Sequence, residues 1–192
     1  MVTITQKDIS QDMAMLTGSL ENDKGVLVSP LAALKLGMTW PLSCVLGYVF
    51  ALCWLAFSYV PKEGPFGNVE SFTDVMESEI VFTIFALVMA IGIGVGLYKV
   101  ALVYLTFKQD MRSQSLIVNH FKKLTSRLAL SVLVVNWAIA VAACVYAPEL
   151  IVAGAFVFVF SVIIAQTIIG AEVARFGLRG AMVKLSKALN KI

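Results

Sequence analysis

Few side chains in this sequence have the types and spacing that catalysis or metal binding requires. The sequence contains a single histidine, His120, which excludes bis-histidine haem ligation and a histidine-rich metal site. Its three cysteines, Cys44, Cys53 and Cys144, lie in apolar runs without the CxxC spacing of a zinc or redox site. No GxSxG, HExxH or Walker A motif occurs. We therefore expect no catalytic residue, no bound metal and no cofactor, and a protein that is not an enzyme.

The polar and small residues inside the apolar runs point to helix packing. Asn136 is the strongest polar side chain within such a run, and Ser161 lies at a similar depth in the next one. Hydrogen bonds between helices in a membrane contribute about 0.6 kcal/mol each on average. Gly92 and Gly96 form a GxxxG pair, which lets a second helix approach closely. We interpret these four as helix-packing residues within the chain; homodimerisation through the two glycines is the alternative.

The elements that position these residues are long apolar runs. Of the 192 residues, 59% are hydrophobic and 14% are charged, against roughly 45–50% and about 25% in a typical soluble domain. A run of about 20 apolar residues crosses the hydrocarbon core of a bilayer. The sequence therefore predicts an all-α integral membrane bundle of four transmembrane helices, with spans at 36–60, 80–98, 128–147 and 150–170. The polar segment 1–35 precedes this transmembrane domain, 36–170, and the basic segment 171–192 follows it.

The basic residues predict how the spans are oriented, because Lys and Arg resist translocation across the membrane. Of the 15 Lys and Arg residues, only Lys62 falls between the first and second spans. The others precede the first span, separate the second from the third, or follow the fourth. Both termini are therefore predicted to be cytoplasmic. The formal net charge of +3 is modest and does not indicate nucleic-acid binding.

Three segments on the predicted cytoplasmic side repeat apolar residues at the helical spacing i, i+4, i+7, i+11. These are Ile9/Met13/Leu16/Leu20, Ile117/Phe121/Leu124/Leu128 and Leu178/Met182/Leu185/Leu189. The pattern predicts amphipathic cytoplasmic helices, each with a narrow apolar stripe. In the last segment, Lys184, Lys187 and Lys191 occupy the opposite face, which is typical of a helix that lies on anionic membrane lipid. A helix that docks on a cytoplasmic partner is the alternative.

Protein recognition is the expected function, because the spans carry no deep ionisable group that would indicate proton-coupled transport.

The segment 98–127 contains no proline or glycine, so the second span is predicted to continue as a helix into the cytoplasm. The external loop 61–79 begins with turn residues and becomes acidic. The candidate recognition residues are Gln109, Asp110, Arg112 and His120 in the connector, and Glu70, Asp74, Glu77 and Glu79 in the loop. A solvated connector and the usual acidity of external loops are the alternative readings.

Two stretches and the layout resemble a known family. The stretches are Ile4-Thr5-Gln6-Lys7-Asp8-Ile9-Ser10 and the SPLAALKLGM region that begins at Ser29, before the first span. With the four-span topology, they resemble the TraS-type entry-exclusion proteins of F-like conjugative plasmids. The resemblance implies a multi-pass protein of the bacterial inner membrane that blocks redundant conjugative DNA transfer by recognising a component of the donor mating apparatus. It assigns no individual residue.

Other function classes fit the same layout. Colicin immunity proteins of the four-span kind share this topology. A structural or accessory subunit of a larger membrane complex has the same features, and a small channel or transporter is a further alternative. The exclusion, immunity and accessory-subunit interpretations all expect a protein partner. Assembly into a homo-oligomer is left open.

Overall fold

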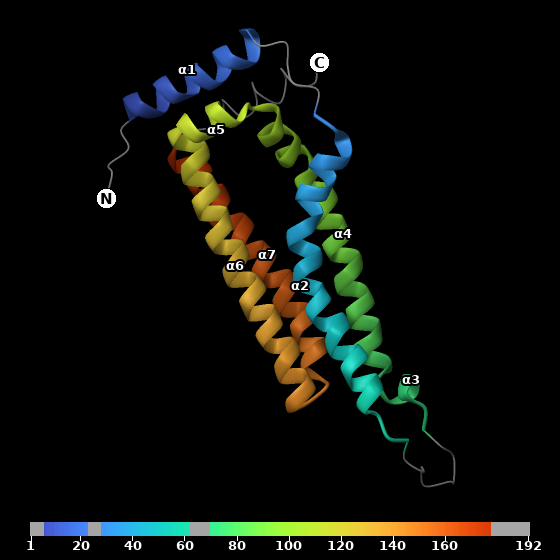
Figure 1. The fold of residues 1–192 in the computed structure, drawn as a ribbon. Helices are drawn as coiled ribbons and strands as arrows, with labels where there is room; N and C mark the ends of the chain where they lie inside the picture. Colours follow the sequence, from blue (N-terminus) through green and yellow to red (C-terminus); the bar gives the residue numbers. More distant parts are fainter. Residues whose placement is uncertain (1–5, 23–27, 62–69, 178–192) are drawn as a thin grey trace.

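The chain is an all-α bundle in the computed structural model (Figure 1). The structure describes residues 6–22, 28–61 and 70–177. Four helices are long and apolar enough to cross a membrane: α2 (Pro30–Ser58), α4 (Glu77–Thr106), α6 (Leu116–Val145) and α7 (Leu150–Arg175). Three shorter helices are α1 (Gln6–Asn22), α3 (Phe72–Val75) and α5 (Gln109–Gln114), and the described ranges contain no strand. The predicted multi-pass membrane fold with four spanning helices is confirmed.

Each long helix extends beyond its predicted span at one end or both, because the backbone continues as helix where hydropathy falls, whereas α2 and α6 end two residues before their predicted spans do. α4 continues past Tyr98 to Thr106, as the lack of proline and glycine in this segment predicts. α6 begins at Leu116, well before the predicted span at Leu128. The predicted apolar stripe of Ile117 and Phe121 is therefore the first part of a membrane-spanning helix and not a separate element. The stripe from Leu178 to Leu189 lies outside the described residues.

The four long helices form a closed ring. α2 packs most extensively against α4 and also contacts α6; α6 contacts α7, and α7 returns to α4. α1 and α5 lie across one end of the bundle, and α3 lies at the other, as Figure 1 shows. We call these the α1 end and the α3 end. α2 and α6 run from the α1 end to the α3 end, and α4 and α7 run back (Figure 1).

Small residues let the long helices approach closely. A Cβ atom added to Gly37 of α2 would lie 2.9 Å from the backbone oxygen of Gly94 in α4. The same addition at Gly94 would bring the new atom to 2.8 Å from Cγ of Met38. These separations are shorter than ordinary carbon contacts of about 3.5–4.0 Å. The α2–α4 contact therefore depends on glycine at both positions.

The prediction that Gly92 and Gly96 pack within the chain is wrong. Both glycines are exposed, and a Cβ atom at either would meet no other atom within 4 Å. The GxxxG spacing places them together on one helix face, but Gly94, between them in sequence, points to the α2 side of α4. The GxxxG pattern therefore predicted the correct helix for close packing but the wrong face of that helix.

Candidate functional site

A buried polar pair occupies the middle of the bundle. Tyr48 of α2 and Asn136 of α6 are both fully buried. The Tyr48 hydroxyl donates to Oδ1 of Asn136 at 2.6 Å, and Nδ2 of Asn136 donates to the backbone oxygen of Val132 at 2.8 Å. Gly154 of α7 faces the Tyr48 ring, where an added Cβ would lie 2.5 Å from the nearest ring carbon. These polar groups bond to each other and the backbone, so their role is helix packing, as the sequence suggested for Asn136.

Two indole groups add hydrogen bonds between α2 and α6. Nε1 of Trp40 donates to the backbone oxygen of Ala129 at 3.0 Å, and Nε1 of Trp137 donates to the backbone oxygen of Ser43 at 2.9 Å. Ser161, the other predicted polar packing residue, is half-buried in α7. The polar contacts of the interior therefore concentrate on the α2–α6 interface.

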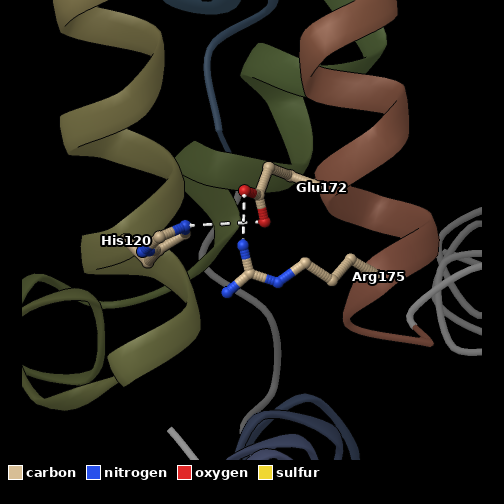
Figure 2. Close-up of polar contacts among 3 residues, drawn as sticks. All are labelled: His120, Glu172 and Arg175. Atoms are coloured by element: carbon tan, nitrogen blue, oxygen red, sulfur yellow. Dashed lines mark hydrogen bonds and ion pairs between the residues drawn. The ribbon is translucent and has the colours of Figure 1, made fainter. Parts of the chain in front are cut away.

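Charged side chains from two spanning helices meet at the α1 end. Figure 2 shows the Glu172 carboxylate of α7 between His120 of α6 and Arg175 of α7. Nη1 of Arg175 donates to Oε1 of Glu172 at 3.0 Å, while Nε2 of His120 lies 3.9 Å from Oε2 of Glu172. The His120 and Glu172 atoms of this longer contact are buried and have no hydrogen-bond partner within the described ranges. Nε2 of His120 and Oε2 of Glu172 therefore form no hydrogen bond with the other members of the cluster.

Aromatic side chains frame this cluster. The His120 ring lies edge-on to the ring of Phe176, with the centroids 5.1 Å apart, and to the ring of Phe121 at 5.9 Å. The Arg175 guanidinium lies 5.5 Å from the Phe176 ring centroid. The side chain of Arg175 is 71% exposed, that of His120 is 34% exposed and that of Glu172 is 21% exposed. Phe176 itself is buried, so the group that this cluster offers most openly to solvent is the Arg175 side chain, and Arg is among the residues that dominate protein interfaces.

α1 supplies a second polar contact at the same end. Asp12 is buried, and its Oδ2 accepts hydrogen bonds from Oγ of Ser115 at 2.8 Å and from the backbone N–H of Ile117 at 2.9 Å. Oγ of Ser115 in turn accepts from the backbone N–H of Val118 at 3.1 Å. Ser115 and Asp12 together therefore cap the start of α6. A carboxylate is favoured there because the first N–H groups of a helix lack intrahelical partners and carry partial positive charge.

Apolar side chains complete the attachment of α1. Leu16 packs with Phe107, at the end of α4. Ile9 and Met13 pack against a second cluster of residues from α6 and α7, comprising Ile117, Phe121, Val173 and Phe176. α1 therefore joins the ends of α4, α6 and α7, and Ile9, Met13 and Leu16 of its predicted stripe face the bundle. The side chain of Leu20, the fourth residue of that stripe, lies outside the part that the structure describes.

The predicted recognition residues of the connector fall into two groups. Gln109 and Asp110 are exposed at the start of α5. Arg112 is half-buried, with its guanidinium carbon 4.9 Å from the centroid of the Tyr104 ring, and His120 belongs to the cluster with Glu172. The first two are exposed, Arg112 lies over Tyr104, and His120 contacts Glu172 while part of its side chain stays exposed.

The predicted recognition residues of the external loop also divide. Glu70, Asp74 and Glu77 are exposed at the α3 end, and the backbone oxygen of Glu70 accepts a hydrogen bond from the Tyr59 hydroxyl at 2.9 Å. The fourth prediction is wrong, because the side chain of Glu79 is buried in the first turn of α4 and accepts a hydrogen bond from Ser78 at 2.8 Å. The acidic character of the loop predicted exposure for all four, but Glu79 falls on the inner face of a spanning helix.

Sequence reasoning missed three residues that organise the α1 end. Ser115 precedes Leu116 in the position of an N-cap, so the start signal of α6 was readable. Asp12 carries no such signal, since its partners lie more than a hundred residues away, and neither does the contact of Glu172 with His120, which lies on another helix. No family model, curated protein or solved structure matches the chain.

Proposed function

We propose that this protein acts by binding a protein partner at its α1 end, and that it is an inner-membrane entry-exclusion protein that blocks redundant conjugative DNA transfer. The observation that carries the proposal is the convergence of His120, Glu172 and Arg175 on a half-exposed surface at one end of the bundle (Figure 2). The resemblance of the opening residues and topology to TraS-type proteins supports the conjugative role. In this proposal the partner is a component of the donor mating apparatus.

The charge distribution supports a cytoplasmic location for the α1 end. The basic residues near this end include Lys99, Lys108, Lys122 and Lys123, while the loop at the α3 end carries Lys62 among several acids. Positive residues are retained on the cytoplasmic side of bacterial inner membranes. We place both chain termini, α1 and the His120 cluster in the cytoplasm.

The contents of the spans support binding over transport. No Asp, Glu, Lys or Arg occurs in 36–58, 80–98, 128–147 or 150–171. The polar pair in the middle, Tyr48 and Asn136, is hydrogen-bonded within the bundle. Ion and proton pathways are usually marked by ionisable groups that face a cavity or one another. The charged chemistry of this chain is instead at the ends of its helices.

Plasmid acquisition by recipient cells that express the chain tests the proposal. Recipients are mated with donors that carry several conjugative plasmids, and a four-span membrane protein of unrelated sequence serves as the control. The expected result is a drop in acquisition confined to one plasmid type. Normal acquisition with every donor, despite verified membrane insertion, would refute the exclusion role.

A matched pair of variants tests whether the His120 cluster is the recognition surface. Glu172→Gln removes the negative charge between His120 and Arg175. Glu149→Gln makes the same change at an exposed position before α7, at the α3 end. We expect Glu172→Gln to weaken exclusion by about tenfold or more, as loss of an interface hot spot does, and Glu149→Gln to leave it unchanged. Equal exclusion by both variants would place recognition elsewhere.

One observation favours a second candidate, an accessory subunit of a larger membrane complex. Gly92 and Gly96 leave a smooth exposed strip on α4 that no residue of the described chain covers. Small residues at this spacing allow close packing of a helix from another subunit or a second copy. Purification in mild detergent tests this candidate: a stoichiometric partner that is lost in the Gly92→Leu variant supports it, and a monomeric chain alone rejects it.

A further inference from the structure

The described side chains of α1 contact the bundle through one face. Asp12 and Leu16 are buried, whereas the opposite face is exposed, at Lys7, Ser10, Gln11 and Ala14. Residues 23–29 connect α1 to α2, and the described contacts of α1 with α4, α6 and α7 come from this one face. In Figure 1, α1 lies as a separate bar across the ends of the other helices. The spans therefore do not depend on α1 for their own closed ring of contacts.

The surface beneath α1 combines a helix start with an apolar floor. The backbone N–H of Ile117 has its acceptor on Asp12, because the first N–H groups of α6 have no partner within the helix. Ser115 serves the N–H of Val118 from within the chain segment that begins α6, so α6 keeps a local cap when α1 is absent. Phe107, Ile117 and Phe176 supply the apolar floor on the ends of α4, α6 and α7. We call this surface the α1 seat.

We propose that the α1 seat is a docking site for an amphipathic helix that carries a carboxylate, and that α1 is a releasable strap that occupies the seat until a partner helix displaces it. The recognised pattern is read from α1 itself. A carboxylate at the position of Asp12 reaches the start of α6, and apolar residues three before, one after and four after it match Ile9, Met13 and Leu16. This inference rests on the proposed function for the identity of the partner, which is the protein recognised at the α1 end.

Release of α1 is physically reasonable because each of its polar groups finds water when the helix leaves. The Asp12 carboxylate becomes solvated, and the Ile117 N–H and Ser115 hydroxyl face the space that α1 vacates. A helix bound in a groove by an apolar stripe is a common mode of peptide recognition. The apparent affinity of a competing helix equals its affinity for the empty seat multiplied by the fraction of time that the seat is empty. A substitution that weakens the binding of α1 to the seat must therefore raise the affinity of the competing helix, so the proposal predicts the direction of the change.

The test uses the full chain in lipid nanodiscs and a fluorescent synthetic peptide of residues 6–22 as the probe. The peptide is expected to bind the wild-type chain saturably. Asp12→Ala in the chain should raise the affinity for the peptide by about tenfold, since loss of a helix-capping side chain weakens the resident α1 by that order. Asp12→Ala in the peptide should lower its affinity for the wild-type chain by about the same factor. Gln11→Ala in the chain, on the exposed face of α1, is the matched control and should change nothing.

Hydrogen exchange at the Ile117 amide, in the wild-type chain and in Asp12→Ala, provides the second measurement. In the wild-type chain this amide should exchange faster than the amides in the middle of α6, because release of α1 exposes it. Exchange as slow as in mid-α6 would show that α1 does not release, and the proposal would fail. Faster exchange in Asp12→Ala without any binding of the peptide would also overturn it, since an open seat would then accept no helix.

Two further outcomes separate this inference from its alternatives. Stable dimers that exchange α1 between copies, detected by light scattering, would overturn the proposal, because the seat would then serve a second copy of the chain. The binding and exchange measurements use purified protein without donor cells. Loss of the exclusion role therefore leaves the peptide result intact, and failure of peptide binding leaves the plasmid assay intact.

Discussion

Replacement of Gly37 by alanine is the sharpest test of how the bundle packs. The added Cβ would lie 2.9 Å from the backbone oxygen of Gly94, 3.4 Å from the backbone nitrogen of Tyr98 and 3.5 Å from the carbonyl carbon of Leu97. All three atoms belong to the backbone of α4, so no side chain can rotate away. The methyl group is accommodated only if α2 and α4 move apart by several tenths of an ångström.

The cost of that movement follows from overpacking. Extra methyl groups forced into a packed interior cost about 1–3 kcal/mol, while alanine is a better helix former than glycine by about 0.8–1.0 kcal/mol. The second effect is the same at an open position such as Gly92 or Gly96, where the new Cβ meets nothing within 4 Å. The difference in stability between Gly37→Ala and Gly92→Ala therefore isolates the steric cost, and we expect Gly37→Ala to be less stable by about 1–3 kcal/mol.

Reversible unfolding in mixed detergent micelles, followed by tryptophan fluorescence, measures this difference. Gly94→Ala should fall between the two, because part of its clash is with Cγ of Met38, a flexible side chain. Equal stability of Gly37→Ala and Gly92→Ala would refute the proposed backbone contact between α2 and α4. Destabilisation by Gly92→Ala alone would indicate that another helix covers the exposed glycine face.

Three other predictions concern the polar contacts and the orientation. Tyr48→Phe should cost about 1 kcal/mol of unfolding free energy, and a double-mutant cycle with Asn136→Leu in the same unfolding assay should show coupling, which independent effects of the two changes would contradict. Ser115→Ala should leave the spans intact but speed amide exchange at Val118 by about tenfold, with Ser113→Ala as the control; unchanged exchange would reject the cap. A fluorescent protein fused after residue 192 should fold and fluoresce in bacterial cells, and a fused alkaline phosphatase should be inactive; the reverse pattern would place the C-terminus outside the cytoplasm.

The spanning helices were predictable because hydropathy is a local property of the sequence. Each predicted span falls within or close to one long helix, and the composition of the segment after Tyr98 predicted that α4 continues. The boundaries were less accurate, since a helix does not end where the hydrocarbon does. α6 begins at Leu116 because Ser115 caps it, twelve positions before apolar residues dominate.

The packing faces and the α1 end were less predictable because they depend on residues distant in the sequence. The GxxxG spacing favoured Gly92 and Gly96, but the choice of face is decided by where Gly37 and Met38 of α2 fall. Asp12 is one of several acids in a polar segment, and only the fold brings it to the start of α6. Asn136 was recognisable as a buried polar residue, whereas its partner Tyr48 was hidden among many aromatic residues.

α6 carries both the packing chemistry and the candidate recognition chemistry, at positions far enough apart to act independently. His120 and Asn136 are separated by about 24 Å along a helix that rises about 1.5 Å per residue. Substitutions more than about 10 Å apart with no shared partner usually have additive effects. We therefore expect the double variant Tyr48→Phe/Glu172→Gln to show the stability loss of the first change and the recognition loss of the second, each undiminished. If Tyr48→Phe alone also abolished recognition in a chain that is still folded and inserted, α6 would transmit changes from the middle of the bundle to the α1 end, and the two sites would have to be treated as one.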